Sequence, residues 1–216
     1  MIYKDIVKLF FFIILFTEFS YPQEESTEIL PKPNINNENS FLTLLTKRRS
    51  YRNFSHEEIS KQKLSEILWA AYGMADTITR KRTVPSAYAS YEINVYAVTK
   101  NGLYLYLPYS HSLKIIGNKD IRKFAGIQGF VAEAPLTLIY VADFDKMRSG
   151  LSDEKKIFLS AANTGFIAQN VYLYCASTGM GTVIRDLINR DLLAEKMGIS
   201  KGNQKIILAQ TIGFPE

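Results

Sequence analysis

The sequence of 216 residues contains one cysteine and two histidines. Cys175 has no partner for a disulfide within the chain, and with only His56 and His111 the chain offers no Cys/His metal spacing. The sequence also lacks a G-x-G-x-x-G run, a G-x-S-x-G run and an internal repeat. These absences exclude a disulfide scaffold, a Rossmann dinucleotide fold and an α/β-hydrolase, and we expect no metal site.

The longest apolar run at the N-terminus is short. Residues 9–16 are unbroken apolar sequence that follows Lys4 and Lys8 and precedes polar sequence from Tyr21. This layout predicts a signal peptide at 1–20, because the run is well short of the roughly 20 residues that a membrane-spanning helix needs. Glu18 makes a poor cleavage site, so an uncleaved N-terminal anchor is the alternative. Either form predicts an exported protein, periplasmic or extracellular, and the anchor would tether it to the membrane.

The remaining chain divides into a linker and one domain. Residues 21–39 hold three prolines and few large apolar residues, which is typical of a linker. Residues 40–216 are long enough for one domain with a sizeable core. The net charge of +5 suits an anionic ligand such as a phosphate, but it is not concentrated enough to indicate nucleic acid.

The run at 153–178 organises the domain. Its apolar residues go almost all the way round a helical wheel, which predicts a helix buried on most faces. If fully helical, the run would span roughly 39 Å. Ala161, Gly165 and Ala168 recur on one side, where a second helix of the same core or of another subunit could approach closely.

Gly179 is placed to end this helix in a left-handed conformation, and residues 181–184 then form a short buried strand. Fixed backbone N–H groups just beyond this turn could meet a ligand. Two amides, Gln169 and Asn170, interrupt the apolar run and need hydrogen-bond partners if they are buried. The alternative is that they cap a loop.

Helical and strand patterns alternate along the rest of the chain. We expect helices near 40–45, at 61–72 and at 191–197, and strands at 93–98, 103–107, 136–141 and 205–212. Lys100-Asn101-Gly102 is a hairpin signature, and residues 55–58 fit a helix capping box. Because hairpins and crossovers occur together, the fold class is α+β, with a mixed or antiparallel sheet flanked by helices.

Two segments could contact a phosphate-bearing planar ligand. The first combines four basic residues with a serine: Lys47, Arg48, Arg49, Ser50 and Arg52. Guanidinium groups bind phosphate through two parallel hydrogen bonds, and a serine hydroxyl adds a donor. The alternative for this segment is a solvated basic turn. The second segment is the loop at 80–87, whose proline and small residues would let a planar ligand lie close to the backbone.

Four stretches, in this order, resemble the nitroreductase family of FMN-dependent oxidoreductases. They are RRSYRNF at 48–54, LWAAYG at 68–73 with RTVPSA at 82–87, AP at 134–135, and TGFIAQNVYLYCASTGMGTVIR at 164–185. The resemblance covers the chain from about residue 40 to the end. LWAAYG with RTVPSA resembles the branch that includes azoline dehydrogenases, which make thiazoles and oxazoles in modified peptides. The resemblance implies a nitroreductase-like fold with a long central helix, and an intertwined homodimer with FMN at its interface.

The resemblance also implies which residues bind FMN. A basic cradle for the phosphate and ribityl chain would consist of Arg48, Arg49, Ser50 and Arg52. A loop of the other subunit would line the flavin with Pro85, Ser86 and Ala87, and the backbone of Ile184, Arg185 and Asp186 would face its reactive edge. Gln128 would be a further contact. No catalytic side chain is implied.

The chain departs from the family pattern at three places. After Ala87 the branch typically has a glycine and then a tyrosine-proline pair, whereas this chain has Tyr88 and then Tyr91-Glu92. The bulk of Tyr88 beside the flavin would reshape or narrow the substrate pocket. No basic pair follows the final strand before Glu216, so the phosphate is expected to depend on the basic cradle. Azoline dehydrogenases share a Lys-Tyr pair near the long helix, whereas this chain has Lys155-Lys156 there, which argues against peptide azole formation.

The predicted function is an exported FMN-dependent oxidoreductase that passes hydride or electrons through bound flavin between a donor and a small organic substrate. NAD(P)H is one candidate donor, although nicotinamides are scarce outside the cytoplasm. Family members that dehalogenate substrates or fragment flavin provide one alternative. A non-catalytic flavin-binding or partner module in the cell envelope provides another.

Overall fold

The computed structural model describes residues 27–32 and 41–216, and no helix in these ranges is long and apolar enough to cross a membrane. The signal peptide expected at 1–20 and most of the linker expected at 21–39 lie outside the described residues. The described part of that linker differs from a free tether. Its strand β1 (Thr27–Ile29) pairs with the sheet, and Leu30, the next residue, is buried and donates its N–H to the carbonyl of His111 (3.1 Å).

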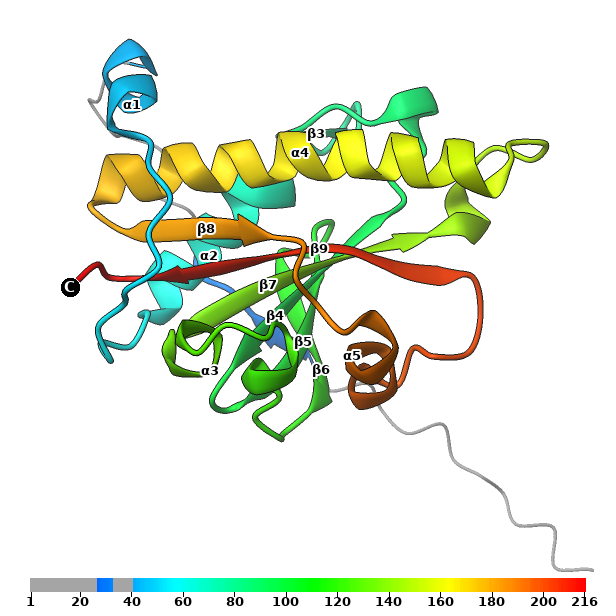
Figure 1. The fold of residues 1–216 in the computed structure, drawn as a ribbon. Coiled ribbons are helices and arrows are strands. Elements are labelled where there is room, and N and C mark those ends of the chain that lie inside the picture. The colour runs from blue at the N-terminus through cyan, green and yellow to red at the C-terminus, as the bar shows by residue number, and fades with distance from the viewer. Residues whose placement is uncertain (1–26, 33–40) are drawn as a thin grey trace, which may run out of the picture.

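A seven-stranded sheet in the order β1-β6-β5-β4-β7-β9-β8 forms the middle layer (Figure 1). After β1, its strands are β4 (Ile93–Thr99), β5 (Gly102–Leu107), β6 (Ser112–Gly117), β7 (Leu136–Asp143), β8 (Gly181–Arg185) and β9 (Gln204–Gly213). All neighbouring strands of this sheet run antiparallel, so of the two expected arrangements the antiparallel one is found. The strands β2 (Met74–Asp76) and β3 (Lys81–Arg82) pair separately.

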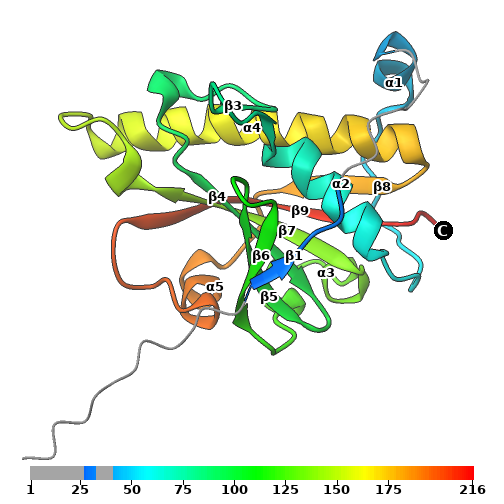
Figure 2. The ribbon, with the colours of Figure 1, turned by 180° about the vertical axis from the view of Figure 1, so that it is seen from behind.

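Helices cover both faces of the sheet (Figures 1 and 2). The helices α2 (Lys61–Tyr72) and α4 (Asp153–Thr178) lie on one face, and α3 (Phe130–Glu133) and α5 (Arg190–Met197) lie on the other. The short helix α1 (Phe41–Lys47) packs against the C-terminal end of α4. This layering confirms the predicted α+β class and its long central helix.

Alternation along the strands divides the interior into two cores. In β4, Val95 and Ala97 face the layer of α2 and α4, whereas Tyr96 and Val98 face the opposite layer. The central strand β7 is buried on both sides, which explains its continuous apolar sequence. A platform packed on both faces therefore holds α4 in place.

The long helix has the predicted bounds. Ser152 caps it, because its side chain accepts the N–H of Lys155, and Gly179 ends it at φ 72°. The capping box expected at residues 55–58 is not formed. The structure uses Ser60, whose side chain accepts the N–H of Lys63, to begin α2.

One side of α4 is exposed in the single chain. Phe158 is 63% and Phe166 is 47% exposed, and Ala161 and Gly165 of the expected small-residue face are also exposed, whereas Ala168 is buried. The prediction that this helix is buried on most faces is therefore wrong for one chain, because the sheet covers only one side. The exposed side is an apolar surface that a second chain could cover.

The loop between β3 and β4 holds three residues in the left-handed backbone region. They are Tyr88 (φ 56°), Ala89 (φ 51°) and Tyr91 (φ 46°). Each such residue costs roughly 1–2 kcal/mol. Tyr88 stands where the resemblance places a glycine, which adopts this conformation without steric cost.

Tyr88→Gly should have a free energy of unfolding in urea about 1 kcal/mol higher than that of Tyr88→Ala. Both substitutions remove the ring, but only glycine removes the steric cost of the left-handed backbone. Ala132→Gly in α3 is the control, and it should lower stability by roughly 0.5–1 kcal/mol. A Tyr88→Gly variant less stable than Tyr88→Ala would contradict the left-handed geometry.

Candidate functional site

The basic segment runs along the outer edge of β8. Ser50 forms a bridge with Thr182, and the N–H of Tyr51 donates to the Thr182 carbonyl (3.1 Å). Gly181 permits this approach, because a Cβ there would lie 2.9 Å from the Tyr51 side chain. The backbone of the segment is thus fixed to the sheet, and it is not a free surface turn.

The hydroxyl of Tyr172 joins the basic segment to β8. It lies 2.8 Å from Ser50 Oγ and accepts the N–H of Ile184 (3.1 Å). The Arg48 guanidinium lies over the Tyr172 ring, 5.3 Å from its centroid. Tyr172 was not among the site residues predicted from the sequence. The available signal was a hydroxyl inside an apolar helical run, since a buried hydroxyl needs a partner.

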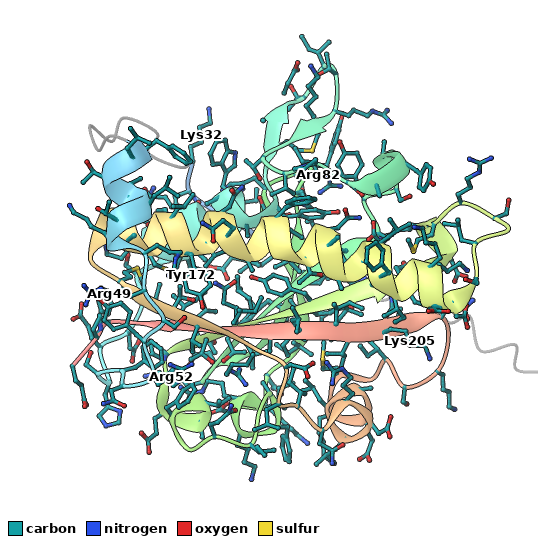
Figure 3. The ribbon with its side chains drawn as sticks, turned by 45° about the horizontal axis from the view of Figure 1, so that its top comes forward. Lys32, Arg49, Arg52, Arg82, Tyr172 and Lys205 are labelled. Carbon is teal, nitrogen blue, oxygen red and sulfur yellow. The ribbon has the colours of Figure 1, made fainter. Side chains whose placement is uncertain are left out.

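Arg49 and Arg52 are exposed at the same end of the molecule as Tyr172 (Figure 3). Across residues 27–32 and 41–216, no carboxylate forms an ion pair with Arg48, Arg49 or Arg52. Arg49, Tyr51 and Tyr172 also line a cavity of about 330 Å³. Guanidinium groups without carboxylate partners fit an anionic group such as a phosphate.

The end of β8 offers fewer backbone donors than expected. The N–H of Ile184 is already bonded to Tyr172. Because N–H groups alternate along an edge strand, the next one to point away from the sheet is that of Asp186. The Asp186 side chain is exposed and pairs with Arg190. Of the three expected positions, Ile184 has its N–H bonded to Tyr172 and Asp186 lies one residue past the end of β8.

The Arg185 side chain points to the face of the sheet away from α4. Its Nε donates to Thr211 Oγ1 (2.9 Å) and its Nη1 to the Ala125 carbonyl (2.8 Å), while a Cβ on Gly126 would overlap Nη1. Burial lowers the pKa of Arg185 to about 10. Its Nη2 and the Oε1 of Gln128 are buried without a hydrogen-bond partner in the described structure. A buried donor and a buried acceptor could both be satisfied by the polar edge of a flavin ring.

The part of the predicted loop that follows β3, residues 83–87, is hydrogen-bonded to α4. Asn163 Oδ1 accepts the N–H of Ala87 (3.2 Å), and Asn163 Nδ2 donates to Ser86 Oγ (3.3 Å). Two turns further along, Asn170 Nδ2 donates to the carbonyls of Thr83 (3.1 Å) and Ala70 (3.0 Å). Asn170 therefore has the partners that its burial requires, whereas Gln169 is exposed on the other side of the helix.

The basic segment and this loop lie apart in one chain. Ser86 and Ala87 are bonded to α4 at Asn163, and Ser50 is bonded to it at Tyr172, which lies nine residues, or roughly 13.5 Å, further along the helix. In Figure 3, Arg82, which immediately precedes the loop, and Arg52 lie on opposite sides of α4. The predicted site residues thus form separate groups, and one chain does not bring Pro85, Ser86 and Ala87 to the basic cradle.

The comparisons with known proteins agree with this fold. A sequence model of the nitroreductase family matches residues 45–214. A nitroreductase-like protein of Methanocaldococcus jannaschii is 35% identical over 150 residues, which cover 65% of this chain and 75% of that protein. The crystal structure of a nitroreductase-like protein of Ralstonia eutropha has a TM-score of 0.83 and 37% identity, over 91% of this chain and 92% of that one.

More distant structures share the fold alone. A chain of the Escherichia coli microcin synthetase complex has a TM-score of 0.70 at 19% identity, over 88% of this chain and 78% of that one. The NADPH:FMN oxidoreductase of Vibrio harveyi has a TM-score of 0.60 at 19% identity, over 81% and 68%. The family match over most of the sequence, together with the Ralstonia structure, identifies this chain as an oxidoreductase of the nitroreductase family.

Proposed function

We propose that the protein is an FMN-dependent oxidoreductase that binds its flavin between two copies of the chain. The main support is a group of three arginines, Arg48, Arg49 and Arg52, that have no carboxylate partner among the described residues. Their backbone segment is bonded to the edge of β8, and the Arg48 guanidinium lies over the Tyr172 ring. When bound, FMN would supply the hydride and electron chemistry between a donor and a small organic acceptor. The protein would supply binding, orientation and exclusion of water.

The phosphate end of the site belongs to the basic segment. Arg48 and Arg52 would hold the phosphate through charged hydrogen bonds, and Ser50 would add a hydroxyl. Tyr172 positions Ser50, because the two hydroxyls lie 2.8 Å apart. It also fixes β8 through the N–H of Ile184, so the phosphate end and the strand end keep a constant separation.

The ring end of the site belongs to three other segments. Gln128 Oε1 would accept from the N–H of the flavin ring, and Arg185 Nη2 would donate to a ring oxygen, which would satisfy both buried atoms. The backbone N–H of Asp186 would face the reactive edge. Ala87 with Pro85, from the other copy, would form a small-residue wall along the ring and keep water away.

A second copy is needed for this site because the loop and the basic segment are apart in one chain. The exposed residues Phe158 and Phe166 of α4, together with Phe41 and Leu42 of α1, give the second copy an apolar surface to cover. Homodimers are also what the resemblance implies for this family. The flavin would then bind where the two copies meet.

The electron donor and the acceptor are proposed at the level of chemical class. NAD(P)H is a candidate donor, and the structure of the Vibrio harveyi oxidoreductase, which shares the fold, is a complex with NAD+. The likeness to the microcin synthetase chain and the LWAAYG with RTVPSA pattern support a place near the azoline-dehydrogenase branch. The missing Lys-Tyr pair favours a small organic acceptor over a peptide azoline.

Arg52→Ala should weaken FMN binding by about ten- to a hundredfold, because a charged hydrogen bond to phosphate contributes roughly 1.5–3 kcal/mol. Riboflavin, which lacks the phosphate, should lose far less. Fluorescence titration of both flavins measures the difference, and Lys205→Ala, at the far end of the molecule in Figure 3, is the control. Equal weakening of FMN and riboflavin, or none, would contradict the phosphate assignment.

The protein without residues 1–20 should sediment as a homodimer with an interface above roughly 2,000 Å². Phe158→Glu and Phe166→Glu place a charge on the exposed side of α4, so each should shift the protein toward monomer and release flavin. Tyr109→Glu, at an exposed tyrosine of the turn between β5 and β6, is the control. A stable monomer that retains flavin would rule out the dimer.

We also propose export, on the N-terminal layout of Lys4, Lys8 and residues 9–16. A reporter fused after Glu24 should be translocated across the membrane, and retention of an active reporter in the cytoplasm would refute the proposal. Carbonate extraction of the full-length protein then separates the two forms, since an uncleaved anchor stays with the membrane and a cleaved protein does not.

A further inference from the structure

The fully buried carboxylate of Glu92 stands at the start of β4, beside the flavin-lining loop. Its relative exposure is 0%. Asn163 Nδ2 donates to its Oε1 (2.9 Å), and Ser86 Oγ donates to its Oε2 (3.2 Å). Both of these donors are neutral. A carboxylate without water is costly to bury unless its oxygens are hydrogen-bonded, so these contacts are essential to its position.

The same network reaches the backbone at both ends of the strained turn. Ser86 Oγ accepts the N–H of Tyr91 (2.9 Å), and Asn163 Oδ1 accepts the N–H of Ala87 (3.2 Å). Ala87 and Tyr91 bracket the left-handed residues Tyr88 and Ala89. Left-handed backbone at residues other than glycine persists only where the surroundings determine it, and here Glu92 and Asn163 provide those surroundings.

A cation lies beside the network. The Arg82 guanidinium is sandwiched between the rings of Tyr72 (4.2 Å to the centroid) and Tyr91 (4.9 Å). Burial raises the pKa of the Tyr72 hydroxyl, while the charges of Arg82 and Glu92 act on it in opposite directions. Arg82 thus places positive charge near the buried carboxylate and packs against the end of the turn.

We propose that Glu92 and Asn163 are positioning residues that hold Ser86 and Ala87 in the conformation that lies against the flavin ring of another copy of the chain. The inference rests on the proposed function. Glu92 acts through Ser86, and Asn163 acts through both Ser86 and Ala87. The buried carboxylate accepts a hydrogen bond from each of Ser86 and Asn163, which leaves Ser86 Oγ placed to accept the N–H of Tyr91 and Asn163 Oδ1 placed to accept the N–H of Ala87.

Glu92→Gln keeps the shape but replaces an acceptor with a donor. Either Ser86 or Asn163 then lacks an acceptor, and the loop loses one of the hydrogen bonds that hold it. Because the loop contacts the ring, which FMN and riboflavin share, the affinity for both flavins should fall by about tenfold. This result differs from that of Arg52→Ala, which weakens FMN selectively.

A charge exchange across the network gives a matched test. Asn163→Asp alone places a second carboxylate beside that of Glu92. It should also lower the affinity for FMN and for riboflavin about tenfold. In the double variant Glu92→Gln with Asn163→Asp, the new amide can donate to the new carboxylate, which can still accept the N–H of Ala87. The double variant should therefore recover most of the affinity that each single variant loses.

The experiment titrates FMN and riboflavin against the wild-type dimer, the two single variants and the double variant. The midpoint potential of the bound flavin is measured for each protein loaded with FMN. The melting temperature is measured for each protein without flavin. Parallel loss of both flavins, a shifted potential and recovery in the double variant would support the proposal. If Glu92→Gln does not fold, Ser86→Ala, which removes the shared hydroxyl, should give the same parallel loss.

Three outcomes would overturn the inference. The first is a lower melting temperature with unchanged flavin affinities and potential, which would make Glu92 and Asn163 residues of stability only. The second is a loss confined to FMN, which would place their effect at the phosphate. The third is no recovery in the double variant. A wild-type protein that binds neither flavin would refute the proposed function itself, and the inference with it.

Discussion

The rigidity of α4 determines how the candidate site is arranged. The helix rests on a sheet packed on both faces, and it carries Asn163, Asn170 and Tyr172 on its buried side. The two asparagines bind the loop before β4, while Tyr172 binds the basic segment and the edge of β8. Because a helix keeps its residues at fixed separations, Ser86 and Ala87, which are bonded to Asn163, stay roughly 13.5 Å along the helix from Tyr172 and the basic segment. In the proposed site, a second copy therefore supplies the loop that lies along the flavin.

Much of the fold could be predicted from local sequence. The bounds of α4, its end at Gly179 and the hairpin at residues 100–102 follow from periodicity and turn residues, which act over a few positions. The strand β1 was missed because three residues of polar linker pair with β6, about 85 residues away, and no local pattern indicates this. The exposed side of α4 was predicted to be buried, because exposed apolar residues such as Phe158 and Phe166 resemble core residues in sequence.

The candidate site was less accessible from the sequence than the fold. The basic segment stood out by its charge, and its attachment to β8 followed from the structure. Tyr172 and Asn163 were not singled out, because their partners Ser50, Ser86 and Glu92 are distant in sequence and only the folded chain brings them together. Glu92 stood out only as part of a departure from the family pattern, and its burial between Ser86 and Asn163 follows from the structure. Tyr88 stood out only as a departure from the family pattern, and the structure supplies the reason, since its backbone is left-handed.

In the proposed arrangement each flavin site combines the basic segment of one copy with the loop of another, and mixed dimers can distinguish this from a site built by one chain. One protomer would carry Arg52→Ala and its partner Ala87→Trp, with both homodimers as controls. Sites shared between copies predict that the mixed dimer has one unaltered site, so one FMN binds per dimer with wild-type affinity while a second binds poorly. If every site of the mixed dimer is as weak as those of the variant homodimers, each chain builds its site alone and the account is contradicted.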